Sequence, residues 1–497
     1  MFESHLTFVT PERAGGRRAK MMAIVNRIFA GALTIAALCS ASPLDQGTRE
    51  LARDVFRQLI EINTTDSSGS TTQAAEAMRA RFIAAGFPAA DAQLLIPEGR
   101  PNKGNLVVRL RAATPVKKPL LIIAHLDVVE ARRSDWTTNP FQFIEKDGYF
   151  YGRGTQDMKA ADAIAVTTLL RLKKEGYAAS RDIILALTAD EEGGTANGVD
   201  WLLKKHRDLV DAAFALNPDS GGMMFVRGKP AYMTLEASEK IYADFEVTAT
   251  NPGGHSSLPV PDNAIYHVAD GLARLEKSPF PFELNPVTRG YFEKLATPAS
   301  VGQRSEMQAI LRDPPDQGAI ARLSSDPLYN ATMRTTCVAT RLAAGHANNA
   351  LPQSATAIVN CRILPGHSPE EIRGDLVRIF ADSKLTVRYI ESKTGKTLDR
   401  APEKTGFPPV EPAPEILKPL ERITDEMWSG APVIPEMETG ASDSVHTIAA
   451  GIPTYGVSGV AFDHNDIRAH GKDERLGTNS FYDGVDFFYR YLKALAQ

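Results

Sequence analysis

Uninterrupted apolar runs alternate with helical patterns between residues 105 and 216. The runs NLVVRL, PLLIIAHLD, DIILALTAD and AFALN are rich in Val, Ile and Leu, which favours strands. KAADAIAVTTLLRLKKEGY and GVDWLLKKHRDLV have the apolar spacing of helices. Apolar strands separated by helices indicate a mainly parallel sheet that helices cover on both faces. We therefore predict an α/β fold for this stretch.

A second pattern begins near Tyr242. Strand ADFEVTAT and helix DNAIYHVADGLARLEK come first; strands MRTTCVATRLAAG and SATAIVNCRIL, helix SPEEIRGDLVRIFAD and strand LTVRYIE follow. The order β-α-β-β-α-β is that of a ferredoxin-like split βαβ sandwich. Between its first helix and second strand, residues 278–330 are rich in proline. We interpret this segment as an irregular insertion.

The remaining chain returns to the first pattern. A proline-rich link around residues 401–414 precedes ASDSVHTIAAG, IPTYGVSG and the helical SFYDGVDFFYRYLKALA. A chain of 497 residues is too long for one hydrophobic core. The simplest organisation is a large domain formed by residues 45–240 and 394–497, with residues 241–393 inserted as a smaller domain.

The first 41 residues have the pattern of a secretory signal. Basic GGRRAKMMAIVNR precedes apolar IFAGALTIAALCSA, with the small residues Cys39 and Ala41 placed for cleavage. The segment before Met21 is long for a signal, so Met21 or Met22 is an alternative start. A membrane anchor is the competing interpretation, but the apolar run is short for a membrane span. We expect a periplasmic or secreted protein without a stable span after cleavage.

Composition narrows the possible partners and the cysteine chemistry. The formal net charge is −4, and no block of Lys or Arg resembles a nucleic-acid surface, so we expect no nucleic-acid partner. Beyond the expected signal, only Cys337 and Cys361 remain. They flank a possible hairpin and could pair across its strands in an oxidising compartment. We favour the interpretation that both are ordinary buried thiols.

Polar side chains occur where the predicted parallel strands end. Ligands of α/β proteins bind at this edge of the sheet. In LIIAHLDV, a strand suited to burial ends in a histidine and an aspartate, which burial penalises unless they meet partners. The polar residues at or just after strand ends are His125, Asp127, Asp190, Glu191, Glu192 and Asp219.

Five side chains have the chemistry of metal ligands. Imidazole combined with carboxylates suits Zn²⁺, with Co²⁺ or Mn²⁺ as substitutes. One bridging carboxylate would let five side chains hold two ions ~3.5–4 Å apart. Asp157 is the natural bridge, because its glycine-containing turn can bring the backbone close to the site. The five are His125, Asp157 in GRGTQDMK, Glu192 in DEEGG, Asp219 in NPDSGG and His470 in IRAHGKDE.

Taken in order, the motifs resemble a known family. AHLDVV, then NPF after Trp136, DGYFYGRGTQDMK, TADEEGG, GGHSSLP and NNALP resemble signatures of the co-catalytic zinc hydrolases. That group includes aminoacylase, carboxypeptidase S, glutamate carboxypeptidase, acetylornithine deacetylase and succinyl-diaminopimelate desuccinylase. The resemblance covers roughly residues 50–490 and looks strongest to the carboxypeptidase S branch.

The resemblance implies roles for the residues at the strand ends. Glu191 would be the general base that passes a proton from water to the leaving nitrogen. Asp127 would orient the imidazole of His125. The implied ligand arrangement is His125 with Asp219 on one zinc, Glu192 with His470 on the other, and Asp157 as the bridge.

The resemblance also implies roles for the inserted domain. It would be a lid and dimerisation domain, and His255 in GGHSSLP would reach the partner subunit of a homodimer to stabilise the oxyanion. Asn349 and Arg362 would contact the substrate, the arginine by pairing with a carboxylate. Gly440 in ETGASDS corresponds to a glycine turn that contacts substrate.

These expectations describe a di-zinc exopeptidase. We predict that it releases a C-terminal amino acid from short or N-blocked peptides. The alternative is an aminoacylase that acts on N-acyl amino acids, with the same site and a different pocket. A non-catalytic descendant would be expected to lose ligands, and here all five ligands and the base are present. Two-metal nucleic-acid chemistry would need a basic surface, which the chain lacks.

Overall fold

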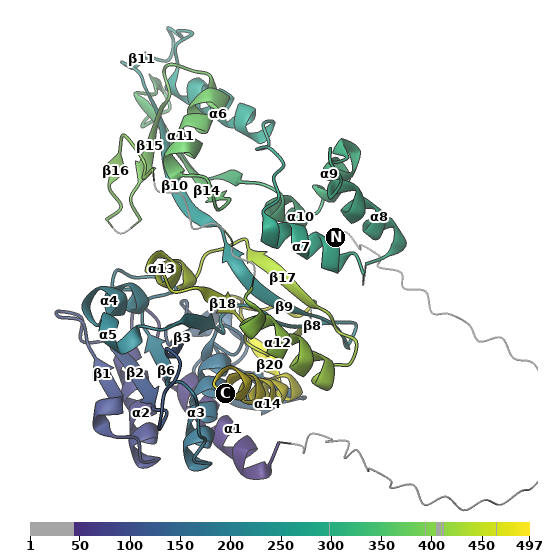
Figure 1. Ribbon diagram of the computed structural model, residues 1–497. Coiled ribbons are helices and arrows are strands. Elements are labelled where there is room, and N and C mark those ends of the chain that lie inside the picture. The colour runs from purple at the N-terminus through teal and green to yellow at the C-terminus, as the bar shows by residue number, and fades with distance from the viewer. Residues whose placement is uncertain (1–43, 298, 393, 404–408, 410–411, 464) are drawn as a thin grey trace, which may run out of the picture.

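We describe the fold from a computed structural model (Figure 1). It describes residues 44–497 apart from residues 298, 393, 404–408, 410–411 and 464. The expected signal peptide therefore lies outside the described residues. No helix among the described residues is long and apolar enough to cross a membrane. Two units are visible in Figure 1: a large part around a ten-stranded sheet, and a small part around a five-stranded sheet between residues 241 and 398.

The sheet of the large part is parallel at its centre and mixed at its sides. Strands β6, β3, β7 and β18 are parallel, whereas β1, β2, β8 and β9 add antiparallel pairings. The order is β1-β2-β6-β3-β7-β18-β9-β8-β19, with β17 beside β9. The bounds are β1 (Ala92–Leu95), β2 (Asn105–Leu110), β3 (Leu120–His125), β6 (Ile183–Thr188), β7 (Phe214–Asn217), β8 (Gly222–Val226), β9 (Lys229–Glu239), β17 (Val433–Glu438), β18 (Thr454–Gly456) and β19 (Ala461–Asp463).

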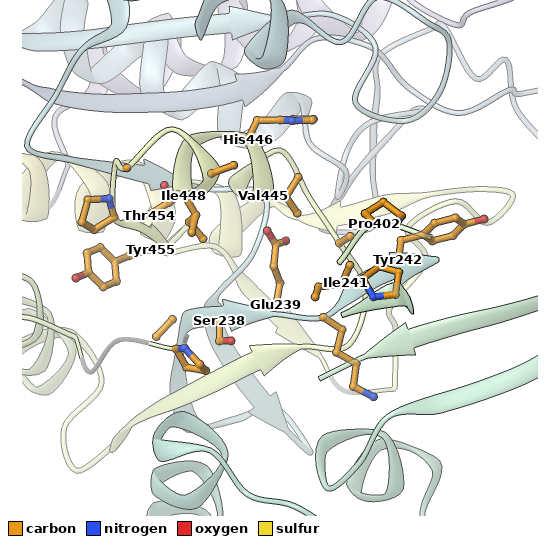
Figure 2. A pocket seen from close by; sticks show the side chains of 18 of the residues that line it. Ser238, Glu239, Ile241, Tyr242, Pro402, Val445, His446, Ile448, Thr454 and Tyr455 are labelled. Carbon is orange, nitrogen blue, oxygen red and sulfur yellow. The ribbon is translucent and has the colours of Figure 1, made fainter. Parts of the chain in front are cut away.

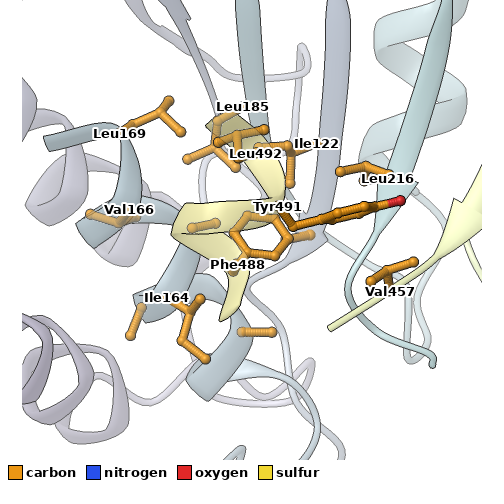
Figure 3. Packing of buried hydrophobic residues seen from close by; sticks show 14 of the residues in the cluster. Ile122, Ile164, Val166, Leu169, Leu185, Leu216, Val457, Phe488, Tyr491 and Leu492 are labelled. Carbon is orange, nitrogen blue, oxygen red and sulfur yellow. The ribbon is translucent and has the colours of Figure 1, made fainter. Parts of the chain in front are cut away.

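Helices cover both faces of this sheet, as predicted. In β3, Leu120 and Ile122 join the core on one face, and Leu121 and Ile123 join the core on the other. This alternation follows the pleat of a strand. Figure 3 shows the first core, where α3 and α14 pack onto the strands. Helices α1 (Gln46–Glu61), α2 (Thr71–Ala84), α3 (Lys159–Lys174), α12 (Pro414–Met427) and α14 (Thr478–Leu495) contribute to it, whereas α4 (Gly198–Lys205) and α5 (Arg207–Val210) contribute to the second.

The small part is an antiparallel sheet with two helices packed on it. Its order β12-β14-β10-β15-β16, with the helices between the first two and the last two long strands, is the predicted ferredoxin-like arrangement plus one edge strand. The edge strand lies beyond residue 393, where we expected this domain to end. The elements are β10 (Ile241–Thr250), α6 (Ala264–Glu276), β12 (Thr336–Ala344), β14 (Ser354–Ile363), α11 (Pro369–Phe380), β15 (Thr386–Ile390) and β16 (Thr397–Leu398).

The prediction that residues 278–330 are irregular was wrong, although the segment does lie between α6 and β12. Four helices occupy most of it, and two begin with a proline, at Pro286 and Pro327. Proline is favourable in the first turn of a helix, where its missing N–H costs nothing. The helices pack against Ile434 of β17 and Tyr232 of β9 in the large part. They are α7 (Pro286–Leu295), α8 (Val301–Ile310), α9 (Gln317–Leu323) and α10 (Pro327–Thr332).

The preference for free thiols was also wrong. Cys337 in β12 and Cys361 in β14 are directly opposite each other in the antiparallel register, and they form a disulfide. Cross-strand neighbours are close enough for such a bond without movement of the backbone. The disulfide therefore joins the edge strand β12 to its inner neighbour β14.

Candidate metal centre

Three of the predicted ligands follow directly from the parallel strands. His125 is the last residue of β3, Glu192 lies in the loop after β6, and Asp219 follows β7. Because β6, β3 and β7 are adjacent and parallel, their carboxyl ends share one edge of the sheet. The local sequence thus places a histidine and two carboxylates around the same point.

A small three-stranded sheet brings the other two ligands to that point. Asp157 lies in the turn between β5 (Tyr149–Tyr151) and α3, and His470 lies before β20 (Arg475–Gly477). Strand β20 pairs with β5, which in turn pairs with β4 (Ile144–Lys146). This pairing holds two segments that are far apart in the sequence side by side.

Asp157 lies between two histidines, with one carboxylate oxygen facing each. Its Oδ1 is 3.2 Å from His125 Nε2, and its Oδ2 is 2.9 Å from His470 Nε2. Asp219 Oδ1 is 3.6 Å from the same nitrogen of His125, and Glu192 Oε2 is 3.0 Å from His470 Nε2. The five side chains therefore form two histidine–carboxylate groups that share Asp157.

The ligand atoms themselves fit a cation. His125 Nε2 and Asp157 Oδ1 are buried and lie 3.2 Å apart, but neither has a partner with hydrogen-bond geometry among the described residues. His125, Asp157 and Glu192 offer ligand atoms that all lie within 4.8 Å of one another. Buried polar atoms without partners are unfavourable, and imidazole with carboxylates is a ligand set that Zn²⁺ prefers. The residues therefore fit a metal centre.

The electrostatics of the two histidines agree with this fit. Burial lowers the pKa of His125, but the carboxylates of Asp157 and Asp219 outweigh it and raise that pKa well above its usual value. Asp157 and Glu192 raise the pKa of His470 to about 10. Each imidazole thus lies in a negative environment that favours a positive charge, whether a proton or a metal ion supplies it.

A buried ion pair holds the turn that carries Asp157. Glu474 Oε2 accepts hydrogen bonds from Arg153 Nη1 at 2.7 Å and from the Gly154 N–H at 2.9 Å. Its Oε1 accepts from the backbone N–H groups of Gln156 at 2.6 Å and Asp157 at 3.1 Å. Removing the carboxylate would leave Arg153 buried without its counter-charge. Glu474 is therefore a positioning residue for the shared ligand.

Asp127 acts on this site mainly through backbone groups. Its carboxylate accepts from the N–H groups of Glu191 at 3.2 Å and Glu192 at 3.0 Å. His125 Nδ1 lies 3.0 Å from the carbonyl oxygen of Asp127 and 3.8 Å from its carboxylate. Burial raises the pKa of Asp127 to about 6. The residue thus holds both the imidazole and the loop that carries the two glutamates.

Glu191 lies in the same loop as the ligand Glu192. Burial, with a further contribution from Asp219, Asp443 and Glu192, raises the pKa of Glu191 to about 10. A carboxyl group surrounded by like charges holds a proton readily, and a nearby cation would shift it back towards the charged form. Such a group can take up and return a proton beside the metal ligands.

Two of the other predicted substrate contacts, His255 and Asn349, lie away from the ligands. His255 in β11 (Gly254–His255) is exposed, with Nδ1 2.7 Å from Ser257 Oγ, and Figure 1 places β11 at the end of the small sheet farthest from the large sheet. Asn349, also exposed, precedes β13 (Ala350–Leu351), the partner of β11. Arg362 lies in β14, and the Gly440 N–H donates to the Glu438 side chain after β17. One copy of the chain does not bring His255 to the metal ligands.

Sequence reasoning missed two carboxylates near the site. Asp443 is buried and accepts from Asn197 Nδ2 at 2.6 Å and Thr188 Oγ1 at 3.4 Å, beside the end of β6. Burial, with Asp127 and Asp219 nearby, raises its pKa to about 7. Glu474 is the second. Both occur in polar loops, ASDS and KDER, whose composition is that of ordinary surface, so only the tertiary contacts reveal them.

Comparison with known proteins identifies the family. Residues 121–494 match peptidase family M20/M25/M40. The chain belongs to this family. It is 28% identical to the N-fatty-acyl-amino acid synthase/hydrolase PM20D1 of Xenopus tropicalis, over 76% of this chain and 72% of that protein. It is 27% identical to the probable carboxypeptidase S-like 2 of Dictyostelium discoideum, over 78% of this chain and 74% of that protein. The resemblance inferred from the motifs is confirmed.

Solved structures confirm the fold. The M20 family metallo-carboxypeptidase Sso-CP2 from Sulfolobus solfataricus has a TM-score of 0.65 with this M20 chain at 16% identity. The similarity covers 91% of this chain and 100% of that one. The α/β architecture with a helix-covered, mostly parallel sheet is therefore that of M20 metallopeptidases. As a member of the M20 family, the protein is a hydrolase of the metallopeptidase and amidohydrolase type.

Proposed function

We propose that this M20 hydrolase is a metallocarboxypeptidase that releases a C-terminal amino acid from short or N-blocked peptides. The observation that carries the proposal is the pair of histidine–carboxylate groups that share Asp157, with Glu191 beside them. The similarity to the carboxypeptidase S-like protein of Dictyostelium supports this substrate class. Arg362 is suited to a free C-terminal carboxylate, because a guanidinium group can bind both of its oxygens.

Two Zn²⁺ ions are the proposed cofactor, with Co²⁺ or Mn²⁺ as substitutes. When bound, they would polarise the scissile carbonyl and make water acidic enough, with a pKa of ~7, to ionise at neutral pH. The residues that would hold them are His125 and Asp219 for one ion, His470 and Glu192 for the other, and Asp157 for both.

The chain's own residues would move the proton. Glu191 would accept a proton from the attacking water and deliver it to the leaving nitrogen, a transfer that contributes ~10²–10⁴-fold to the rate in comparable enzymes. Asp127 would keep Glu191 in place through its hydrogen bond to the Glu191 N–H. Proton transfer would thus depend on the loop of Glu191 and Glu192, whose backbone N–H groups donate to the Asp127 carboxylate.

The small part would serve as lid and dimerisation domain. His255 is exposed and lies far from the ligands of its own chain, so it is suited to act on the partner subunit of a homodimer. There it would stabilise the oxyanion, while Asn349 and Arg362 bind the substrate around its carboxylate. Gly440 would contact the substrate from the large part.

An aminoacylase that acts on N-acyl amino acids is the second candidate. The relative from Xenopus carries a name for hydrolysis of N-fatty-acyl amino acids, and its similarity covers most of this chain. Both candidates cut an amide bond beside a free amino acid carboxylate. They differ in the group on the other side of that bond, so substrate comparison separates them.

The test is hydrolysis of two substrates by the zinc-loaded protein. N-benzyloxycarbonyl-Gly-Leu represents the carboxypeptidase, and N-acetyl-leucine represents the aminoacylase. We expect cleavage of the first, loss of cleavage after chelation, and recovery with zinc. Preference for N-acetyl-leucine would favour the aminoacylase instead, and zinc-loaded protein inert to both would contradict the substrate class.

We further propose that the protein is exported to the periplasm or secreted. The N-terminal pattern supports cleavage of a signal near Ala41. The disulfide between Cys337 and Cys361 agrees with an oxidising compartment, because such bonds rarely persist in the cytosol. N-terminal sequencing of the protein from culture supernatant or periplasm would test the cleavage.

A further inference from the structure

A cavity of about 620 Å³ lies where the large and small parts meet (Figure 2). Its wall is mostly apolar: Tyr242 and Tyr389 come from the small part, and Val445, Ile448 and Tyr455 come from the large part. None of the five metal ligands is among the described residues that line it. Its volume is in the range of small-molecule sites, ~300–1,000 Å³.

The cavity adjoins both positions proposed to contact the released amino acid. The guanidinium carbon of Arg362 lies 4.7 Å from the ring centre of Tyr242, which is part of the cavity wall. Ala441 also lines the cavity, and it directly follows Gly440. A substrate carboxylate at Arg362 would therefore lie next to the cavity.

The loop after Gly440 links the cavity to the edge of the sheet that bears the metal ligands. Ser442 Oγ accepts a hydrogen bond from Asn217 Nδ2 at 3.1 Å, and Asn217 is two residues before the ligand Asp219. On its other side, the same serine donates from its N–H to Glu239 Oε2 at 2.8 Å. Glu239 lines the cavity. Ser442 thus contacts both Asn217, which is near the metal ligands, and Glu239, which is in the cavity wall.

Glu239 is the one carboxylate among the described residues of this mostly apolar wall, which Lys240 and His446 also line. Its Oε2 accepts from the Ser442 N–H and hydroxyl, at 2.8 and 3.0 Å, whereas its Oε1 is buried without a partner among the described residues. Figure 2 shows the carboxylate pointing from the end of β9 towards Val445, on α13 (Ser444–Ala449). Burial raises the pKa of Glu239 to about 8, so the carboxylate is charged, and Oε1 is an acceptor, above that pH. An unpaired acceptor here calls for a donor from a ligand.

We propose that this cavity receives the side chain of the amino acid that the enzyme releases, and that Glu239 selects a large apolar side chain ending in an N–H or O–H donor. The inference rests on the proposed function. With its carboxylate at Arg362, the amino acid directs its side chain past Tyr242 into the cavity. The aromatic walls pack against the body of the side chain, and Glu239 Oε1 accepts from its polar end, as an indole N–H would allow.

The test compares N-benzyloxycarbonyl-Gly-X substrates in which X is tryptophan, 2-naphthylalanine or alanine, with the zinc-loaded full chain at pH 9, where the Glu239 carboxylate is charged. Tryptophan and naphthylalanine have similar shapes, but only tryptophan has the N–H donor. We expect kcat/KM for tryptophan to exceed that for naphthylalanine about tenfold, the usual size of a hydrogen bond to a charged group. Alanine should be cleaved more slowly than either.

Glu239→Gln tests the polar end. The Ser442 donors need an acceptor, so the glutamine oxygen would face Ser442 and its NH₂ group would face the cavity. Two donors would then meet, and the advantage of tryptophan over naphthylalanine should disappear. Cleavage of the alanine substrate should stay close to wild type, which also shows that the variant is folded.

Val445→Trp tests the cavity itself. A larger side chain should fill the space, lowering kcat/KM for the tryptophan substrate about tenfold or more while sparing the alanine substrate. Ala449→Trp, at the end of α13, is a second variant with the same expectation. Val116→Trp is the matched control, because Val116 is 78% exposed and lies outside the cavity.

The outcomes separate this inference from the proposed function. If all three substrates are cleaved but tryptophan and naphthylalanine are cleaved equally, Glu239 does not select the side chain. If Val445→Trp and Ala449→Trp both leave the tryptophan substrate unaffected, the cavity is not its pocket. If zinc-loaded protein cleaves none of the three, the proposed function fails, and this inference fails with it.

Discussion

The large and small parts present their candidate site residues in opposite ways. In the large part, ligands from widely separated segments converge, so that the two oxygens of Asp157 face His125 and His470 at 3.2 and 2.9 Å. In the small part, His255 and Asn349 are exposed and lie away from those ligands. A parallel sheet collects strand ends at one edge by its geometry alone. Whether His255 and Asn349 can reach a set of metal ligands depends instead on how the small part moves or associates with a second chain.

The largest effect on metal binding and activity is expected when the shared ligand, Asp157, is changed. Asp157→Asn removes the negative charge that both groups share, so neither ion should bind tightly and activity should fall about ten-thousandfold, since each ion contributes several kcal/mol. Metal analysis and turnover of the zinc-loaded protein measure this loss. Asp208→Asn, on an exposed helix position, is the control and should change neither. Two ions per chain in the Asp157→Asn protein would contradict the shared-ligand assignment.

The adjacent glutamates separate metal binding from proton transfer. Glu191→Gln should keep the metal but reduce kcat about a thousandfold, because only the proton carrier is lost. Glu192→Gln should lose metal as well, since Glu192 lies 3.0 Å from His470 Nε2. Measuring metal content and kcat for both variants compares neighbours on one loop. Near-normal turnover of metal-loaded Glu191→Gln protein would rule out Glu191 as the base.

The grouping of the candidate metal ligands in the large part was largely predictable from the sequence. A histidine and an aspartate at the end of an otherwise apolar strand are informative, because burial penalises them without partners. Asp443 and Glu474 could not be predicted in this way. Their carboxylates accept from groups that are distant in the sequence, Asn197 for the first and Arg153 for the second. Such contacts depend on the completed fold.

The small part was predictable in its order of elements but not in its details. The disulfide depends on the register that places Cys337 opposite Cys361, which two cysteine positions alone do not determine. The many prolines of residues 278–330 led to the prediction of irregular structure, although Pro286 and Pro327 begin helices there. The packing of these helices on the large part is a long-range contact that local patterns do not encode.

A smaller effect is expected from the distal histidine, and it tests whether a second chain completes the site. His255→Ala should reduce kcat about a hundredfold, as loss of an oxyanion donor does in other hydrolases. Mixing it with Glu191→Gln protein should restore activity, because a mixed dimer has one site with an intact base and an intact His255. Assays of the two proteins alone and mixed, with sedimentation, measure this. A fully active monomer, or no recovery on mixing, would contradict action in trans.

Removing the disulfide should affect the stability of the small part and spare the metal centre. The bond closes a loop between residues 337 and 361, and such loops contribute ~3 kcal/mol by restricting the unfolded chain. The double variant Cys337→Ser and Cys361→Ser should therefore unfold at lower denaturant concentration, with metal content unchanged at 25 °C. Denaturation followed by circular dichroism, with metal analysis, measures both. If the double variant also lost its metal at 25 °C, the stability of the small part and metal binding by the large part would not be independent.

The smallest expected effect is a pH dependence confined to the small part. His267 Nδ1 lies 2.7 Å from Asp382 Oδ2, and its Nε2 lies 3.1 Å from Asp262 Oδ1, so it ties the segment before α6 to the segment after α11. Asp382, and then Asp262, raise the pKa of His267, with Lys384 and Arg274 also facing these carboxylates.

A histidine whose pKa is raised on folding stabilises the fold fully below its unfolded pKa of ~6.5, and this stabilisation is lost as pH rises through the folded pKa. The Tm of the wild type should therefore exceed that of His267→Gln by about one or two degrees at pH 5.5, since both pairs are partly exposed to solvent, and the difference should shrink by pH 9. Thermal melts of both proteins at the two pH values, with saturating zinc, measure it. A difference that grows with pH would reverse the sign and show that the imidazole is held in its neutral form.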